Sequence, residues 1–330
     1  MHPVLYAIVL LLVGFIILIK GADLLVNGAS SAAKKYGISN LAIGLTVVAF
    51  GTSMPEFMVS LLSALDGKSD ASFGNIIGSN NLNLLLILGV AGMIYPLVIQ
   101  RNTVKYEVPI SLLAAASLFF LVNDSLFGLR DSPPVDLLSR FDSTILLIFF
   151  SGFLFYIYRT MKRTSDLEEG VPIKLYSTRV SIGMFLLGLG MLIGGGELVV
   201  TNAIEIAKYY HLSEKLIGLT ILAAGTSLPE LATSCVAAYR KNTDIAIGNV
   251  IGSNIFNILL ILGVTGLVNP IPYNNAMNFD LYVLFGSTIL LMIFMFTLST
   301  RKLDRWEAFF MLAAYITYTI YLVSSDVAFP

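Results

Sequence analysis

The sequence has very little charge. Only 12% of its 330 residues are Asp, Glu, Lys or Arg, 56% are hydrophobic, and the mean hydropathy is +0.83. Soluble globular chains carry about 25% charged residues, so the composition excludes an ordinary water-soluble domain and indicates a protein that lies in a membrane. The formal net charge of −1 gives no reason to expect a nucleic-acid partner.

Cysteine and histidine are also scarce. Cys235 is the only cysteine, which excludes a disulfide within the chain, and the two histidines are His2 and His211. Without a cluster of these residues, we expect neither a zinc nor a copper site, and no cofactor. No signal-peptide cleavage pattern precedes the first apolar run, so we expect this run to be kept as the first membrane span.

Long apolar runs fill most of the chain. A transmembrane helix needs about 20 mostly apolar residues, and the charged segment 161–178 divides the apolar runs into two groups of five. The ten predicted spans are 3–20, 40–64, 72–97, 107–123, 142–159, 179–201, 214–238, 246–268, 280–298 and 306–325. We therefore expect an all-α integral membrane protein with ten transmembrane helices as two five-helix repeats, 1–160 and 179–330, joined by a cytoplasmic loop at 161–178.

One stretch of the sequence occurs twice. Residues 44–92 align with residues 218–266 at a constant offset of 174, without a gap, and 26 of the 49 positions are identical. Each copy contains GTS-x-PE followed by GN-x-IGSN-x-x-N. Because each repeat has an odd number of spans, the second repeat enters the membrane in the opposite sense. Sites in such inverted repeats lie near the bilayer midplane where the repeats meet.

Basic residues are distributed unevenly over the connections between spans. Fifteen of the 20 Lys and Arg residues fall in one set of alternating connections and five in the other. The richer set faces the cytoplasm in multi-pass membrane proteins. We therefore expect a multi-pass protein of the cell membrane with both termini on the extracellular side.

Glu56 and Glu230 occupy equivalent positions inside apolar spans. An ionised side chain at membrane depth is costly. The only Lys or Arg within the two spans is Lys215, at the first turn of 214–238 and fifteen residues before Glu230. A single buried glutamate is often protonated or paired for structural reasons, but two at symmetric positions favour a function. Two facing carboxylates repel each other unless a cation or a proton lies between them.

Pro55 and Pro229 directly precede these glutamates. Proline removes a backbone donor and leaves a carbonyl one turn earlier without its helical partner, so we expect a break in each helix. Such a kink is common in membrane helices for structural reasons alone. In transporters, however, the carbonyl groups of unwound helices bind cations. The carbonyls nearest to the two breaks belong to residues 49–52 and 223–226.

Small polar side chains share helix faces within both copies. The pairs with i, i+4 spacing are Thr52/Glu56, Ser79/Asn83, Thr226/Glu230 and Ser253/Asn257. Carboxylate, hydroxyl, amide and carbonyl oxygens are hard ligands that suit Ca²⁺ and Na⁺. The remaining amides of the motif, interpreted as interhelical hydrogen-bonding residues, are Asn75, Asn80, Asn249 and Asn254. The glycine pairs 74/78 and 248/252 indicate close helix packing.

These paired motifs resemble the α-repeats of the cation/Ca²⁺ exchanger superfamily, and specifically those of the prokaryotic sodium/calcium exchangers. The resemblance implies four cation sites in a diamond where the repeats meet. By motif position it implies these ligands: Ala49 (carbonyl), Thr52, Ser53, Glu56, Ser79 and Asn83 in the first copy, and Ala223 (carbonyl), Thr226, Ser227, Glu230, Ser253 and Asn257 in the second. It also implies that the first and sixth spans slide against the other eight.

Asn257 marks a departure from part of the superfamily. Potassium-dependent exchangers typically have Asp at this position, so the chain resembles the potassium-independent branch. Its site then holds only two carboxylates, whose charge of −2 balances one Ca²⁺. This charge fixes neither the number of Na⁺ ions nor a role for protons.

Taken together, the sequence predicts a secondary antiporter that exchanges Na⁺ for Ca²⁺ by alternating access and works as a monomer. A proton/Ca²⁺ antiporter is the alternative, because Glu56 and Glu230 could carry protons instead. A cation channel is disfavoured, since channels usually have symmetric subunits around a shared pore whereas this chain has internal symmetry. An enzyme is disfavoured further, because no nucleophile–base set is present.

Overall fold

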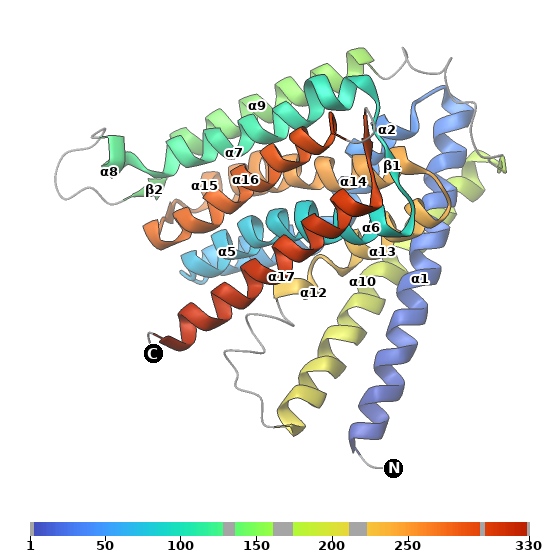
Figure 1. Ribbon diagram of the computed structural model, residues 1–330, viewed down its shortest axis with the longest axis horizontal. Coiled ribbons are helices and arrows are strands. Elements are labelled where there is room, and N and C mark those ends of the chain that lie inside the picture. The colour runs from blue at the N-terminus through green and yellow to red at the C-terminus, as the bar shows by residue number, and fades with distance from the viewer. Residues whose placement is uncertain (1–2, 128–135, 161–173, 211–222, 298–300, 329–330) are drawn as a thin grey trace.

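The computed structural model describes the chain except for residues 1–2, 128–135, 161–173, 211–222, 298–300 and 329–330 (Figure 1). The α-helices are α1 (Pro3–Tyr36), α2 (Asn40–Ile43), α3 (Ala49–Thr52), α4 (Met54–Leu65), α5 (Ser69–Asn81), α6 (Leu88–Ile94), α7 (Val108–Val122), α8 (Asp124–Phe127), α9 (Arg140–Thr160), α10 (Thr178–Tyr209), α12 (Ala223–Gly225), α13 (Leu228–Tyr239), α14 (Thr243–Ile255), α15 (Gly263–Val268), α16 (Asn278–Phe294) and α17 (Arg305–Ala328). Wider π-helical turns are η1 (Gly44–Val48), η2 (Leu82–Ile87), η3 (Thr103–Glu107) and η5 (Phe256–Leu262), and η6 (Asn275–Met277) is a 3₁₀ turn. The strands are β1 (Leu97–Val98), β2 (Leu137–Leu138), β3 (Ile271–Pro272) and β4 (Lys302–Leu303).

The described part of the chain is mostly helical, as the composition predicts. Within it, eight helices are long and apolar enough to cross a membrane, and the bent pair Asn40–Thr52 and Met54–Leu65 makes a ninth span. The predicted span 214–238 is described only as α12 and α13, because its first part falls in 211–222. Counting the bent pair as one span, nine of the ten expected spans correspond to membrane-length helices of the described part, with different ends: 72–97 ends at Ile94 and 280–298 at Phe294.

Two predicted spans, 3–20 and 179–201, are too short. Helix α1 continues to Tyr36, and α10 runs from Thr178 to Tyr209. Polar residues after position 20 lower the hydropathy of α1, but they bind neighbouring elements instead of ending the helix. Asp23 and Asn27 both accept hydrogen bonds from the guanidinium of Arg240, which directly follows α13.

Helices α1 and α10 form an antiparallel pair that stands apart from the other long helices (Figure 1). Glycines recur every seven residues along their contact, at Gly14 and Gly21 on α1 and at Gly188 and Gly195 on α10. A Cβ added to Gly188 would lie 2.6 Å from the carbonyl oxygen of Gly21, and one added to Gly195 would lie 3.1 Å from that of Gly14. Small residues thus allow the two backbones to touch, as in other close membrane helix pairs.

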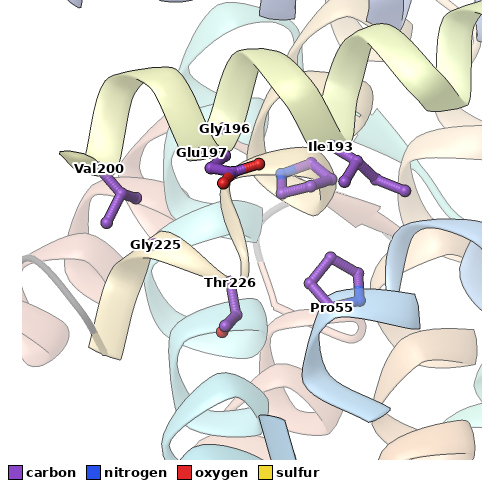
Figure 2. Close-up of a pocket in the computed structure, with 8 residues that line it drawn as sticks. Pro55, Ile193, Gly196, Glu197, Val200, Gly225 and Thr226 are labelled. Atoms are coloured by element: carbon purple, nitrogen blue, oxygen red, sulfur yellow. The ribbon is translucent and has the colours of Figure 1, made fainter. Parts of the chain in front are cut away.

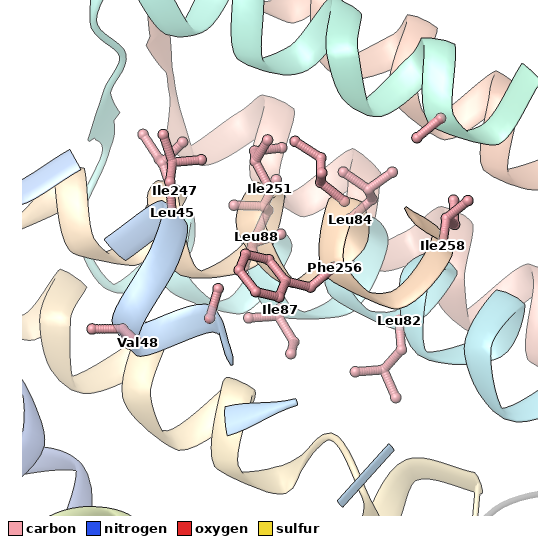
Figure 3. Close-up of a cluster of buried hydrophobic side chains, with 14 of the residues drawn as sticks. Leu45, Val48, Leu82, Leu84, Ile87, Leu88, Ile247, Ile251, Phe256 and Ile258 are labelled. Atoms are coloured by element: carbon pink, nitrogen blue, oxygen red, sulfur yellow. The ribbon is translucent and has the colours of Figure 1, made fainter. Parts of the chain in front are cut away.

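The helices that carry the second motif of each copy lie at the centre of the molecule. In the most apolar stretches of Ser69–Ile94 and Thr243–Val268, 78% and 94% of the residues are buried, against 17–33% in the other long spans. Figure 3 shows the apolar side chains that pack between these helices and η1, including Leu45, Ile251 and Phe256. The other helices therefore surround this centre and present their apolar outer faces to lipid.

Glycines 248 and 252 pack closely, as the sequence predicts. A Cβ at Gly248 would meet the carbonyl oxygen of Leu41 at 2.9 Å, and one at Gly252 would meet that of Leu45 at 2.7 Å. Gly74 and Gly78 have no comparable contact with described residues. The residues equivalent to Leu41 and Leu45 are at 215 and 219, which lie outside the described residues.

Two short antiparallel ladders connect the repeats. Strand β1 pairs with β4, with Leu97 opposite Leu303, and β2 pairs with β3, with Leu138 opposite Ile271. Strands β1 and β3 follow the central helices of their repeats at equivalent positions. Each ladder therefore joins one strand from each repeat. The backbone contacts thus follow the internal two-fold pseudo-symmetry of the sequence.

The glycine contact gives the first testable prediction. Gly188→Ala forces a Cβ into the backbone of α1, and such overpacking destabilises a protein by about 1–3 kcal/mol. Gly190→Ala is the matched control, because a Cβ at Gly190 meets nothing within 4 Å and alanine favours the helix by about 1 kcal/mol. Thermal unfolding in detergent should show a lower midpoint for the first variant and an equal or higher midpoint for the second; equal midpoints would contradict the close packing of α1 and α10.

Candidate ion-binding site

Each copy of the repeat breaks its helix at the same serine. Ser53 lies between α3 and α4 with φ −83° and ψ 7°, and Ser227 lies before α13 with φ −90° and ψ 7°. The prolines at 55 and 229 occupy the first turn of the following helix, where a missing N–H costs nothing. The axis bends by 47° at the first break, which confirms the predicted interruption.

The breaks place both glutamates in the first turn of a new helix. Glu56 lies in the first turn of α4 and Glu230 in that of α13, and each is only 1% exposed. The N-terminus of a helix carries a partial positive charge that stabilises a nearby carboxylate. The backbone therefore offsets part of the cost of burying these two groups.

Each glutamate carboxylate accepts a hydrogen bond from a serine of the opposite repeat. Ser53 Oγ donates a hydrogen bond of 2.9 Å to Glu230 Oε1, and Ser227 Oγ donates one of 2.8 Å to Glu56 Oε1. Both serines are almost completely buried. The two glutamates are thus brought to one interface between the repeats, as the pseudo-symmetry of the sequence predicts.

Further hydroxyl groups extend this interface. The remaining contacts are Ser227 Oγ to Ser79 Oγ (3.0 Å), Ser253 Oγ to Glu230 Oε1 (3.4 Å), Thr52 Oγ1 to Asn249 Oδ1 (3.0 Å) and Thr226 Oγ1 to Asn75 Oδ1 (3.2 Å). Each predicted ligand with a hydroxyl group therefore contacts a glutamate, a serine that binds a glutamate, or one of the motif amides.

The two predicted amide ligands lie on π-helical turns. Asn83 is in η2 and Asn257 is in η5, and both are buried. Asn83 Nδ2 donates to Asn254 Oδ1 and Asn257 Nδ2 donates to Asn80 Oδ1, each at 2.9 Å. Wide π-helical turns are frequent at functional sites, but nothing in the sequence pattern predicted them here.

Four buried oxygens of the predicted ligands have no hydrogen-bond partner among the described residues. They are Glu56 Oε2, Glu230 Oε2, Asn83 Oδ1 and Asn257 Oδ1, two from each repeat at equivalent positions. Leaving a buried acceptor unpaired costs about 1–3 kcal/mol, and more for a charged group. Carboxylate and amide oxygens in this number suit a hard cation such as Ca²⁺ or Na⁺.

The two backbone carbonyls implied by the family resemblance belong to Ala49 and Ala223. The carbonyl oxygen of Ala49 accepts the N–H of Ser53 at 3.0 Å and lies 3.4 Å from Thr52 Oγ1. It is therefore already hydrogen-bonded. Ala223 is the first residue of α12 and borders on 211–222, outside the described residues.

A cavity of about 190 Å³ opens beside the helix breaks. It lies between α10 and the two breaks and is lined by Pro55, Ile193, Gly196, Glu197, Val200, Gly225, Thr226 and Pro229 (Figure 2). Glu197 lies on the wall of this cavity, within the predicted span 179–201, but is not among the predicted ligands. Glu197 occupies the position that corresponds to Asp23 when the two repeats are aligned, and this match of two acidic residues is the signal that could have identified it.

Amides outside the predicted ligand set support the glutamate helices. Asn75 Nδ2 donates to the carbonyl oxygen of Glu56 (3.1 Å) and to Ser60 Oγ (2.9 Å). Asn249 Nδ2 makes the equivalent contacts in the second repeat, with the carbonyl oxygen of Glu230 and with Ser234 Oγ. These bonds between helices agree with the interhelical role that the sequence analysis assigned to the two residues.

Two repeats that join carboxylates, hydroxyls and amide oxygens inside a bundle of membrane-spanning helices define a multi-pass membrane transporter of cations. The chain belongs to the sodium/calcium exchanger protein family, whose profile matches residues 6–159 and 180–324. It is a cation/Ca²⁺ antiporter and not an enzyme.

Relatives match over almost the whole chain. The putative antiporter CaxA of Alkalimonas amylolytica is 36% identical over 97% of this chain and 100% of its own length. The sodium/calcium exchanger MaX1 of Methanosarcina acetivorans is 30% identical over 95% and 97%. A solved structure of the sodium-calcium exchanger NCX_Mj, soaked with zero Na⁺ and Ca²⁺, has 33% identity and a TM-score of 0.80 over 97% of this chain and 99% of that one.

The site geometry predicts the effect of removing either carboxylate. Glu56→Gln or Glu230→Gln removes one of the two buried carboxylate charges that would attract a divalent ion where water does not screen them. We expect each variant to fold but to lose Ca²⁺-dependent thermal stabilisation in detergent. Glu107→Gln is the control, because Glu107 is another buried glutamate whose carboxylate accepts from Tyr156 outside the site. Stabilisation by Ca²⁺ that survives in either site variant would contradict the assignment.

Proposed function

We propose that this antiporter exchanges Na⁺ for Ca²⁺ by alternating access, with both ions binding where the two repeats meet. The proposed ligands are Ala49 and Ala223 through their carbonyls, and Thr52, Ser53, Glu56, Ser79, Asn83, Thr226, Ser227, Glu230, Ser253 and Asn257 through their side chains. The observation that carries this proposal is the set of four unpartnered, buried oxygens contributed equally by the repeats.

The charge of the site supports competition between the two ions. Two carboxylates offset the charge of one Ca²⁺, or of two Na⁺ ions, in the same cluster of oxygens. Because both ions prefer hard oxygen ligands, they compete for overlapping positions. Competition for one site is what couples the outward movement of one ion to the inward movement of the other.

The two amides favour Na⁺ over a proton as the counter-ion. Protonation of Glu56 and Glu230 would neutralise the carboxylates but would leave Asn83 Oδ1 and Asn257 Oδ1 without partners. An unpaired buried acceptor is unfavourable, whereas Na⁺ can bind amide and carboxylate oxygens together. The names of MaX1 and NCX_Mj, both sodium/calcium exchangers, point the same way.

Alternating access is supported by the division of the helices. The glycine contact between α1 and α10 is tight enough for the pair to move as one unit. This pair borders the cavity at the helix breaks through Glu197 and Gly196 of α10. Movement of the pair past the breaks would open the site first to one side of the membrane and then to the other.

Contacts between connecting segments support an inverted orientation of the repeats. On one side, β1 pairs with β4, and Gln100 binds Asp244. On the other, β2 pairs with β3, and Asn274 binds Asp70. The excess of Lys and Arg assigns the first side to the cytoplasm, which leaves both termini outside the cell membrane. A site formed entirely within one chain supports a functional monomer.

Ion-gradient experiments test the counter-ion. Proteoliposomes loaded with Na⁺ should take up ⁴⁵Ca²⁺, whereas vesicles loaded with K⁺ or holding only a pH gradient should not, since the site has no third carboxylate. The Glu56→Gln protein serves as the inactive control. Uptake driven equally well by a pH gradient without Na⁺ would assign the protein to the proton/Ca²⁺ antiporters.

Cysteine labelling tests the orientation. Ser69 and Thr243 are equivalent residues at the starts of α5 and α14, and Cys235→Ser removes the only native thiol. In that background, Ser69→Cys should react with an impermeant maleimide in intact cells, and Thr243→Cys only after the membrane is opened. Labelling of both positions from the same side would refute the inverted repeat.

A further inference from the structure

Asn80 and Asn254 form a crossed pair at the centre of the molecule. Asn80 Nδ2 donates to the backbone carbonyl oxygen of Asn254, and Asn254 Nδ2 donates to that of Asn80, both at 3.2 Å. Both residues are completely buried. They occupy equivalent positions in the two repeats, so they lie where the two central helices cross on the pseudo-symmetry axis.

These two bonds fix the orientation of the Asn80 and Asn254 amides, and through them the orientation of the Asn257 and Asn83 amides. The oxygen and the nitrogen of an asparagine side chain have similar size and shape, so the orientation of the amide is decided by its hydrogen-bond partners. A backbone carbonyl oxygen only accepts, however, so the nitrogen of Asn80 must face Asn254 and its Oδ1 must face outward. That Oδ1 then accepts from Asn257 Nδ2 at 2.9 Å.

The ligand amides are left with one possible orientation. With the nitrogen of Asn257 bound to Asn80, its Oδ1 faces the other way and is one of the four unpartnered oxygens. Asn254 acts on Asn83 in the same manner, because Asn254 Oδ1 accepts from Asn83 Nδ2 at 2.9 Å. A chain of hydrogen bonds therefore leads from the backbone carbonyls at the helix crossing to the Asn80 and Asn254 amides. It continues to Asn257 and Asn83, whose Oδ1 atoms are left unpartnered.

We propose that Asn80 and Asn254 are positioning residues that aim the oxygens of Asn257 and Asn83 at the transported ions. They also require a group at 83 and 257 that can donate a hydrogen bond. An ionised carboxylate introduced by Asn257→Asp would place a second acceptor against Asn80 Oδ1 with no hydrogen between them. This inference rests on the proposed ligand set and adds to it the groups that orient the two amides.

Asn81 provides a matched control one residue along the chain. Its side chain is also an amide and is also buried, but Nδ2 donates to the backbone carbonyl oxygen of Asp280, away from the ligand amides. The equivalent residue in the second repeat is Ile255, so Asn81→Ile is a change that the fold already accepts at the symmetric position.

Equilibrium ⁴⁵Ca²⁺ binding to the purified protein in Na⁺-free buffer tests the proposal. Partners that orient a metal ligand are worth about 10- to 100-fold in metal affinity, so Asn80→Leu and Asn254→Leu should each weaken Ca²⁺ binding by this factor. Asn81→Ile should bind Ca²⁺ like the wild type. Equal effects of Asn80→Leu and Asn81→Ile, or no effect of Asn80→Leu and Asn254→Leu, would overturn the proposal.

A double-mutant cycle separates positioning from general stability. In an Asn257→Ala background, Asn80→Leu should weaken Ca²⁺ binding by less than about threefold, because contacting residues act non-additively. A full additional loss would show that Asn80 does not act through Asn257. If Asn80→Leu is not recovered as folded protein, Asn80→Ser enters the same cycle. Wild-type protein that binds no Ca²⁺ would overturn the proposed function, whereas wild-type binding with an unaffected Asn80 variant overturns this inference alone.

Discussion

The burial of two carboxylates inside the membrane is the constraint on which the rest of the structure depends. Glu56 and Glu230 are each 1% exposed, and neither forms an ion pair within the described part of the chain. Charged groups at this depth are costly unless something compensates them. Each carboxylate lies in the first turn of a helix, and one of its oxygens accepts from serine hydroxyls while the other oxygen is unpaired. An ion that bound both free oxygens would relieve the repulsion between the carboxylates.

Neither repeat can build this site alone. Ser53 of the first repeat binds the glutamate of the second, and Ser227 returns the same bond. The crossed amides form a second reciprocal contact between the repeats, and each short β-ladder pairs one strand from each repeat. Equivalent residues from opposite repeats therefore contact each other, and each half of the site depends on both repeats.

Much of this arrangement could be predicted from the sequence, because the two copies align at a constant offset and each contains the same candidate site residues. The helix breaks and the meeting of the two glutamates follow from Pro55, Pro229 and the odd number of spans. Hydrogen bonds across the repeats could not be predicted, since i, i+4 spacing shows which side chains share a face but not which face meets the other repeat. The length of α1 was missed because hydropathy treats Asp23 as a helix-ending charge, whereas Arg240 binds it. The roles of Asn80 and Asn254 depend on backbone carbonyls that only the folded chain brings together.

The central claim is that two repeats form a single Ca²⁺ site rather than one site each. The number of Ca²⁺ ions bound per chain at saturation, measured by equilibrium dialysis of the purified protein in Na⁺-free buffer, tests this claim most directly. Shared ligation by Glu56 and Glu230 predicts one Ca²⁺ per chain, displaced completely by Na⁺. Two Ca²⁺ ions per chain, or one that Na⁺ does not displace, would contradict it.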